Sequence, residues 1–175
     1  KLHPDDIDPN LIYISLLVAT DEYGAPFTDL LWRQFKQSDN ANDRQNLLGA
    51  MAHSIHPVVA AAVRERILSP ELKDNEVPTI LWGQMDRAEN RKAIWSWTQL
   101  HINEVLERVP NWKKGQLPSY FDEFCTREEA TDIENTFQPI IDKLESGPRY
   151  LANTLETIRL CAAFVDHHKS TSGEL

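Results

Sequence analysis

The sequence predicts an all-α protein built from antiparallel helix hairpins. Apolar residues recur at helical spacing along most of the chain, and no stretch sustains the two-residue alternation typical of a strand. Proline and glycine interrupt this pattern about every 15–20 residues, which leaves short connections between neighbouring helices. We therefore expect a single α-α superhelix of the HEAT or armadillo type over residues 1–168 and a disordered tail over 169–175. A globular helical bundle is the alternative architecture.

The N-terminal half carries start and stop signals for five helices. Asp8 is a favourable N-cap for a helix whose first residue is Pro9, and Gly24 is expected to end that helix. Pro26 begins the second helix, which places apolar residues on one face. The third helix is expected to start at about Asn40 or Asn42 and to end at His53. The other two helices of this half are expected at about residues 58–68 and 78–85.

The C-terminal half begins with the longest uninterrupted helical pattern, residues 90–106, which predicts one continuous helix. A short apolar helix is expected over 117–125. Thr126 then opens the sequence Thr-Arg-Glu-Glu, which matches a capping box and predicts a new helix start. Pro139 is expected to kink or split that helix, and the last helix should start near Pro148.

Composition excludes several classes of function. The 175 residues are 41% hydrophobic and 26% charged, the balance of an ordinary globular protein. The net charge of −9 opposes binding to nucleic acid, and no basic stripe is present. The longest apolar run, Leu11 to Ala19, is too short to span a bilayer. We expect neither a nucleic-acid nor a membrane partner, and a start at Lys1 rather than Met suggests a processed product or a fragment.

Few side chains are of a type that could act in catalysis or bind a metal ion, and none of them forms a recognised motif. Cys125 and Cys161 are too few for a disulfide scaffold and are interpreted as two buried, small apolar residues. His-Ser-Ile-His at 53–56 lacks the glutamate of a zinc hydrolase motif and is interpreted as a solvated helix end, and His167-His168 as part of the tail. We therefore assign no catalytic residue and no metal ligand. The tryptophans, notably those at 95 and 97, are expected to pack in the core rather than line a groove.

Several segments together resemble the C-terminal helical domain of zinc aminopeptidases of the aminopeptidase N and endoplasmic-reticulum aminopeptidase family. Arg-Gln-Asn-Leu-Leu-Gly-Ala-Met at 44–51 is similar to the family's R-x-x-L-L-x-A-L helix. Asn-Arg-Lys-Ala-Ile-Trp-Ser-Trp at 90–97 is close to its G-R-x-x-A-W-x-F pattern. An acidic segment at 126–137 leads to 149–159, which is like the family's R-x-L-x-Q-x-L-E-x-I-R ending. The resemblance spans residues 44–164, in the family's order.

The resemblance implies a superhelix of helix pairs that caps the catalytic domain of the same polypeptide and contacts peptide substrates. It implies that zinc and the catalytic residues lie in a domain upstream, so that this fragment holds no cofactor. Asn90 stands where the family has glycine, and Asn153 where it has glutamine.

Two arginines are candidate contacts for a peptide carboxylate. Arg87 and Arg91 lie one helical turn apart and so share one face. The alternative for both is a salt bridge with a neighbouring acid such as Glu89 or with a facing helix. For the chain as a whole, the alternative function is a free-standing helical-repeat scaffold that binds a protein through its groove.

Overall fold

The computed structural model describes residues 8–172 and confirms the all-α fold class, since these residues form helices and no strand. In chain order the elements are α1 (Pro9–Tyr23), α2 (Ala25–Gln37), α3 (Ala41–Ala52), α4 (Pro57–Glu65), the 3-10 helix η2 (Arg66–Leu68), α5 (Val77–Met85), α6 (Ala88–Leu100), α7 (Ile102–Arg108), the 3-10 helix η3 (Asn111–Phe121), α8 (Arg127–Ile141) and α9 (Gly147–Ser172). Within residues 8–172, no helix is both long enough and apolar enough to cross a bilayer.

The helices group into two compact units. Unit 1 ends at Arg108 and holds α1 to α7, and unit 2 begins at Val109 and holds η3, α8 and α9. Each unit has its own core of fully buried apolar side chains, which include Leu48 and Ile80 in unit 1 and Phe121 and Phe137 in unit 2.

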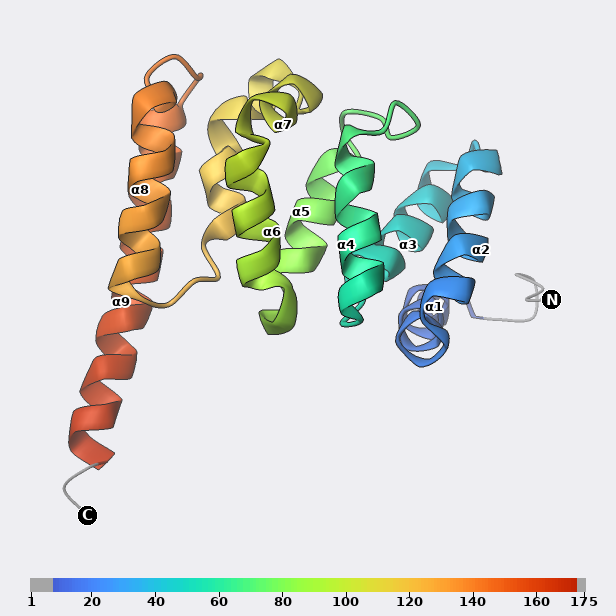
Figure 1. Cartoon of the computed structure of the whole chain (residues 1–175), viewed down its shortest axis with the longest axis horizontal. Helices are drawn as coiled ribbons and strands as arrows, with labels where there is room; N and C mark the ends of the chain where they lie inside the picture. The colour runs from blue at the N-terminus through green and yellow to red at the C-terminus, as the bar shows by residue number, and fades with distance from the viewer. Residues whose placement is uncertain (1–7, 173–175) are drawn as a thin grey trace. The chain divides into compact units, whose positions relative to one another are not determined.

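The helices of unit 1 lie in two rows. Contacts join α1 to α3 and α3 to α5 in one row, and α2 to α4 and α4 to α6 in the other (Figure 1). The two rows contact each other through pairs that are consecutive in sequence, such as α1 with α2 and α5 with α6. This is the arrangement that stacked antiparallel hairpins produce.

Helix boundaries in unit 1 follow the predicted signals closely. Gly24 adopts a φ of 61° between α1 and α2, a left-handed conformation that side chains disfavour. The side chain of Asn40 caps α3 by accepting hydrogen bonds from the amides of Asn42 and Asp43. Tight turns and caps therefore set the hairpins.

One helix of the predicted set is divided. The expected helix over 90–106 becomes α6 and α7, because His101 leaves helical geometry with φ −114° and ψ 24°. The His101 ring lies against the Trp97 ring, with centroids 4.6 Å apart, and its Nδ1 atom is 3.5 Å from Glu104. Neither glycine nor proline occurs at this point, so the break has no signal in the sequence.

A buried ion pair joins the start of α3 to the residue before α5. The Arg44 guanidinium donates two hydrogen bonds to the Glu76 carboxylate, at 2.6 and 2.8 Å, and a third to the carbonyl of Phe35. Both charged side chains are almost fully buried. Burial alone would raise the pKa of Glu76, but hydrogen bonds from Arg44 and from the Lys73 amide outweigh it and hold that pKa below its usual range.

The tryptophans are unevenly divided between the units. Unit 1 contains Trp32, Trp82, Trp95 and Trp97, and unit 2 contains Trp112. Trp95 and Trp97 are buried, which confirms the prediction that they pack in the core, and Trp97 donates a hydrogen bond to Glu65 at 2.7 Å. Trp82 and Trp112 are exposed.

Unit 2 contains the predicted capping box. The amide of Glu129 donates to the Thr126 hydroxyl at 3.1 Å, while the Glu129 carboxylate accepts from that hydroxyl and from the amide of Cys125. Helix α8 passes through Pro139 without being split and ends two residues later. Helix α9 ends at Ser172.

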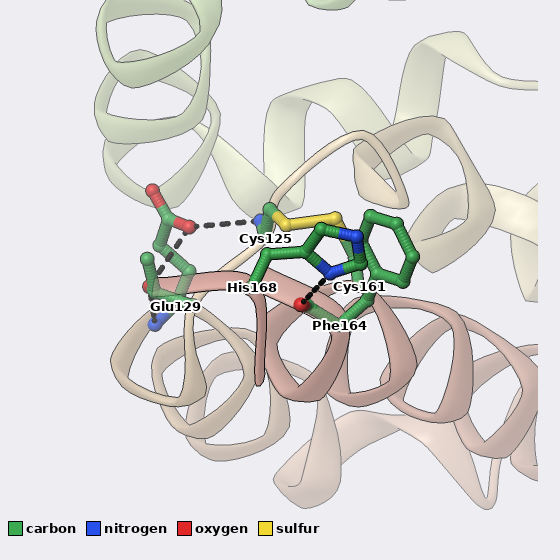
Figure 2. The surroundings of a disulfide bond; sticks show 6 residues. Cys125, Glu129, Cys161, Phe164 and His168 are labelled. Atoms are coloured by element: carbon green, nitrogen blue, oxygen red, sulfur yellow. Dashed lines mark hydrogen bonds between the residues drawn. A yellow bond between two sulfur atoms is a disulfide. The ribbon is translucent and has the colours of Figure 1, made fainter. Parts of the chain in front are cut away.

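The prediction of two free cysteines is wrong, because Cys125 and Cys161 form a disulfide across unit 2 (Figure 2). The bond joins the residue before the α8 cap to the middle of α9, with Cα atoms 5.0 Å apart. A separation of 36 residues in sequence gives no indication of this proximity. Only the packing of α8 against α9 brings the two side chains together.

Candidate functional site

The two candidate arginines lie at the junction between α5 and α6. Each donates a hydrogen bond to a backbone carbonyl at the C-terminal end of a helix. Arg87 is the N-cap residue of α6, and its Nε atom donates to the carbonyl of His53 at 3.0 Å. Arg91 donates from Nε to the carbonyl of Met85 at 2.7 Å. The last carbonyls of a helix lack intrahelical partners, so each arginine satisfies one such group, at the end of α3 and of α5 respectively.

Arg87 also faces an acid on a neighbouring helix. Its Nη2 atom is 4.0 Å from the Asp21 carboxylate of α1, so its acidic partner comes from a facing helix. Asp21 is itself held in place, because its carboxylate accepts from the amide of Ile55 and its carbonyl bonds the ring Nε2 of His56. Nη1 of Arg87 has no hydrogen bond among the described residues, and the side chain is 30% exposed.

The partly buried His53 lies beside Arg87 at the end of α3. Its Nδ1 atom is 2.7 Å from the carbonyl of Gly49 and 3.1 Å from the Tyr13 hydroxyl, and its Nε2 atom is 3.6 Å from Asp86. Burial raises the pKa of the Tyr13 hydroxyl, and the nearby Arg87 charge opposes that shift. The tyrosine therefore stays neutral at physiological pH.

A buried asparagine completes this junction. The Asn90 side chain donates to the carbonyl of Ser54 at 2.8 Å, which ties α6 to the segment between α3 and α4. Sequence reasoning missed Asp21 and Asn90, because their partners lie 34 to 36 residues away in the chain. The cluster of Tyr13, Asp21, His53, Arg87 and Asn90 is called the junction site below.

The junction site does not fit a metal ion. His53 and His56 belong to the ends of different helices, and their rings bond different groups. Over residues 8–172, no group of three or more His, Cys, Asp or Glu side chains could hold a metal. In α9, the His168 ring bonds the carbonyl of Phe164 and lies against the Phe164 ring at a tilt of 37°, with centroids 4.1 Å apart (Figure 2).

Unit 2 contains an open groove of about 510 Å³ between α8 and α9. Its walls include the apolar side chains of Ile141, Leu151 and Leu155. Arg159 and Glu134, which also line it, are joined by an exposed hydrogen-bonded ion pair at 2.6 Å. The groove lacks the convergent buried polar groups that mark a specific small-molecule site.

Comparison with known proteins identifies the family. The model of the ERAP1-like C-terminal domain matches residues 2–160. Aminopeptidase M1 of Arabidopsis thaliana is 24% identical over 175 aligned residues, which cover 96% of this chain and 19% of that protein. Aminopeptidase M1-A of Oryza sativa subsp. japonica is 21% identical over 160 residues, which cover 88% of this chain and 17% of that protein. The chain thus spans about a fifth of the length of these relatives, and it belongs to the ERAP1-like C-terminal domain family of the aminopeptidases.

Proposed function

We propose that this chain is the non-catalytic C-terminal domain of a zinc aminopeptidase, in which it caps the active-site chamber of the catalytic domain. The observation that carries the proposal is the family match over residues 2–160, combined with aminopeptidase relatives several times longer than the chain. The partner is then the catalytic domain of the same polypeptide. The substrates are peptides from which the N-terminal residue is removed.

Zinc enters this proposal only through the catalytic domain. A catalytic zinc polarises the scissile carbonyl and lowers the pKa of its bound water. Because the described residues of this chain do not fit a zinc site, no step of the hydrolysis is assigned to them. Their contribution is to exclude bulk water from the chamber and to hold the distal part of the peptide.

Arg87 and Arg91 have different roles in the proposed binding of peptide. Nη1 of Arg87 has no hydrogen bond within residues 8–172, and Arg87 is the residue that would meet a peptide carboxylate. Arg91 fixes the end of α5 and thereby the junction that carries Arg87. In the full-length enzyme, Arg87→Gln is expected to raise KM several-fold for peptides with a free C-terminal carboxylate and to leave aminoacyl-anilides unaffected. Lys92→Ala, an exposed change one residue beyond Arg91, is the matched control.

The experiment that tests the function compares three proteins: the 175-residue chain, the full-length gene product, and that product lacking residues 1–175. We expect zinc-dependent hydrolysis of aminoacyl-anilides by the full-length protein and none by the 175-residue chain. Without residues 1–175, selectivity for peptide length should be lost before hydrolysis of the small anilide. A reading frame without a zinc motif upstream, or zinc-dependent turnover by the pure chain, would overturn the proposal.

A further inference from the structure

Helix α1 carries apolar residues on every side. Between Pro9 and Thr20 its sequence contains no charged residue, and the first acid is Asp21. A helix that is apolar all round is normally covered on all sides, whereas a surface helix shows a polar face. Helix α2, by contrast, buries Leu31 and Phe35 and exposes Arg33 and Gln34.

Within residues 8–172, only one side of α1 is covered. Thr20 is fully buried and Leu16 nearly so, on the side toward α2 and α3. Leu11, Ile14 and Val18 are 55%, 52% and 57% exposed, and their spacing of three and four residues puts them on one face. These three residues are called the α1 stripe. Single exposed apolar residues are common on protein surfaces, but three aligned on one otherwise uncharged stretch are unusual.

The two-row arrangement of unit 1 indicates where a further helix would pack against the α1 stripe. In the row formed by α1, α3 and α5, helix α3 has a neighbour on both sides (Figure 1). Among the helices that the structure describes, α1 has a neighbour in the row on one side only. The α1 stripe therefore lies where the next member of the row would pack. The relatives extend far beyond the matched region. In a C-terminal domain the rest of the polypeptide precedes the domain in sequence, and α1 is the first helix of this chain that the structure describes.

We infer that the α1 stripe is covered in the full-length enzyme by an apolar helix face from the polypeptide that precedes this chain. The inference rests on the proposed function, because that function supplies the preceding polypeptide. The fitting occupant is a helix with apolar residues spaced three and four apart, which meets Leu11, Ile14 and Val18 as α3 meets the opposite face of α1. The stripe would then extend the helix row into the rest of the enzyme.

The experiment uses an engineered thiol, which is the single free thiol of the 175-residue chain because Cys125 and Cys161 form the disulfide. Val18→Cys places the thiol in the stripe, and Gln34→Cys places a control thiol on the exposed polar face of α2. Each variant is treated with a maleimide in the 175-residue chain and in the full-length protein, and the labelling rate is followed by mass spectrometry. The thiol at position 18 should react rapidly in the 175-residue chain and at least roughly tenfold more slowly in the full-length protein, since a covered thiol must wait for local opening. The thiol at position 34 should react equally in both.

Equal labelling rates at position 18 in the two proteins would overturn the inference. Slow labelling in the 175-residue chain, together with a dimeric mass by light scattering, would also overturn it, because a second copy would then cover the stripe. Aminopeptidase activity of the full-length protein is measured in parallel. Protection at position 18 without such activity would refute the proposed function and leave the docking surface standing.

Discussion

Removal of the Cys125–Cys161 disulfide should destabilise unit 2 and leave unit 1 unchanged. The bond closes a loop of 36 residues that contains all of α8 and half of α9. In the chain-entropy description, a cross-link of this length removes about 4 kcal/mol of conformational freedom from the unfolded state. Unit 2 spans only residues 109–175, and domains are stable by roughly 0.05–0.15 kcal/mol per residue. The disulfide therefore accounts for a large share of the stability of unit 2.

The perturbation is the double variant Cys125→Ser, Cys161→Ser, which removes the bond without leaving an odd thiol. Urea unfolding is followed by hydrogen exchange, which distinguishes amides in α8 and α9 from those in α3 and α5. We expect protection in α8 and α9 to fall by about 4 kcal/mol, and protection in unit 1 to stay the same. Reduction of the unmodified chain with a dithiol should give the same loss, and the double variant should not respond to the dithiol.

Two results would refute this reasoning. Titration of two free thiols in the native, air-oxidised chain would show that the bond does not form. Equal protection of α8 and α9 in the oxidised and reduced chains would show that the bond forms but does not constrain the unfolded state. Neither result would depend on the activity of the parent enzyme.

The remaining predictions concern single residues. Arg44→Met should cost unit 1 about 3–5 kcal/mol, measured from its denaturant midpoint, because it leaves the Glu76 carboxylate buried without its cation; a loss below about 1 kcal/mol would contradict this account. Because the pKa of Glu76 is depressed in the folded state, its contribution is fully present above about pH 4.5 and is lost as pH falls through the lower, folded value. Glu76→Gln should flatten that part of the acid unfolding curve of unit 1. Gly115→Ala should cost unit 2 about 1–3 kcal/mol by hydrogen exchange, because the added Cβ would meet the backbone carbonyl of Glu145, and an unchanged exchange rate would show that this segment moves aside.

Most helices and their capping residues could be predicted from the sequence, because the residues that start and end a helix act locally. Gly24, Asn40 and Thr126 act within a few residues of their own positions, and each ends or begins a helix as predicted. The break at His101 and the disulfide were not predictable in this way. The disulfide depends on side chains that meet only after α8 and α9 have packed. At His101 the sequence has neither glycine nor proline to signal the break.

For the candidate site, too, the sequence predicts features that depend on neighbouring residues but not the partners that come from distant parts of the chain. That Arg87 and Arg91 share a helix face follows from their spacing, and the structure places both at the start of α6. Their actual partners are the carbonyls of His53 and Met85, which could not be identified without knowing which helix ends converge there. The same is true of Asn90, whose buried amide binds a carbonyl 36 residues away.

The uneven division of tryptophans has a practical consequence for optical studies of this protein. The buried indoles of Trp95 and Trp97 belong to unit 1, so their emission should shift to longer wavelength when that unit unfolds. Trp112 belongs to unit 2 and is already exposed, so its emission should change little. Intrinsic fluorescence therefore reports on unit 1, whereas the redox state of the chain acts on unit 2. A chain monitored by fluorescence alone could lose the fold of its C-terminal helices and still look native.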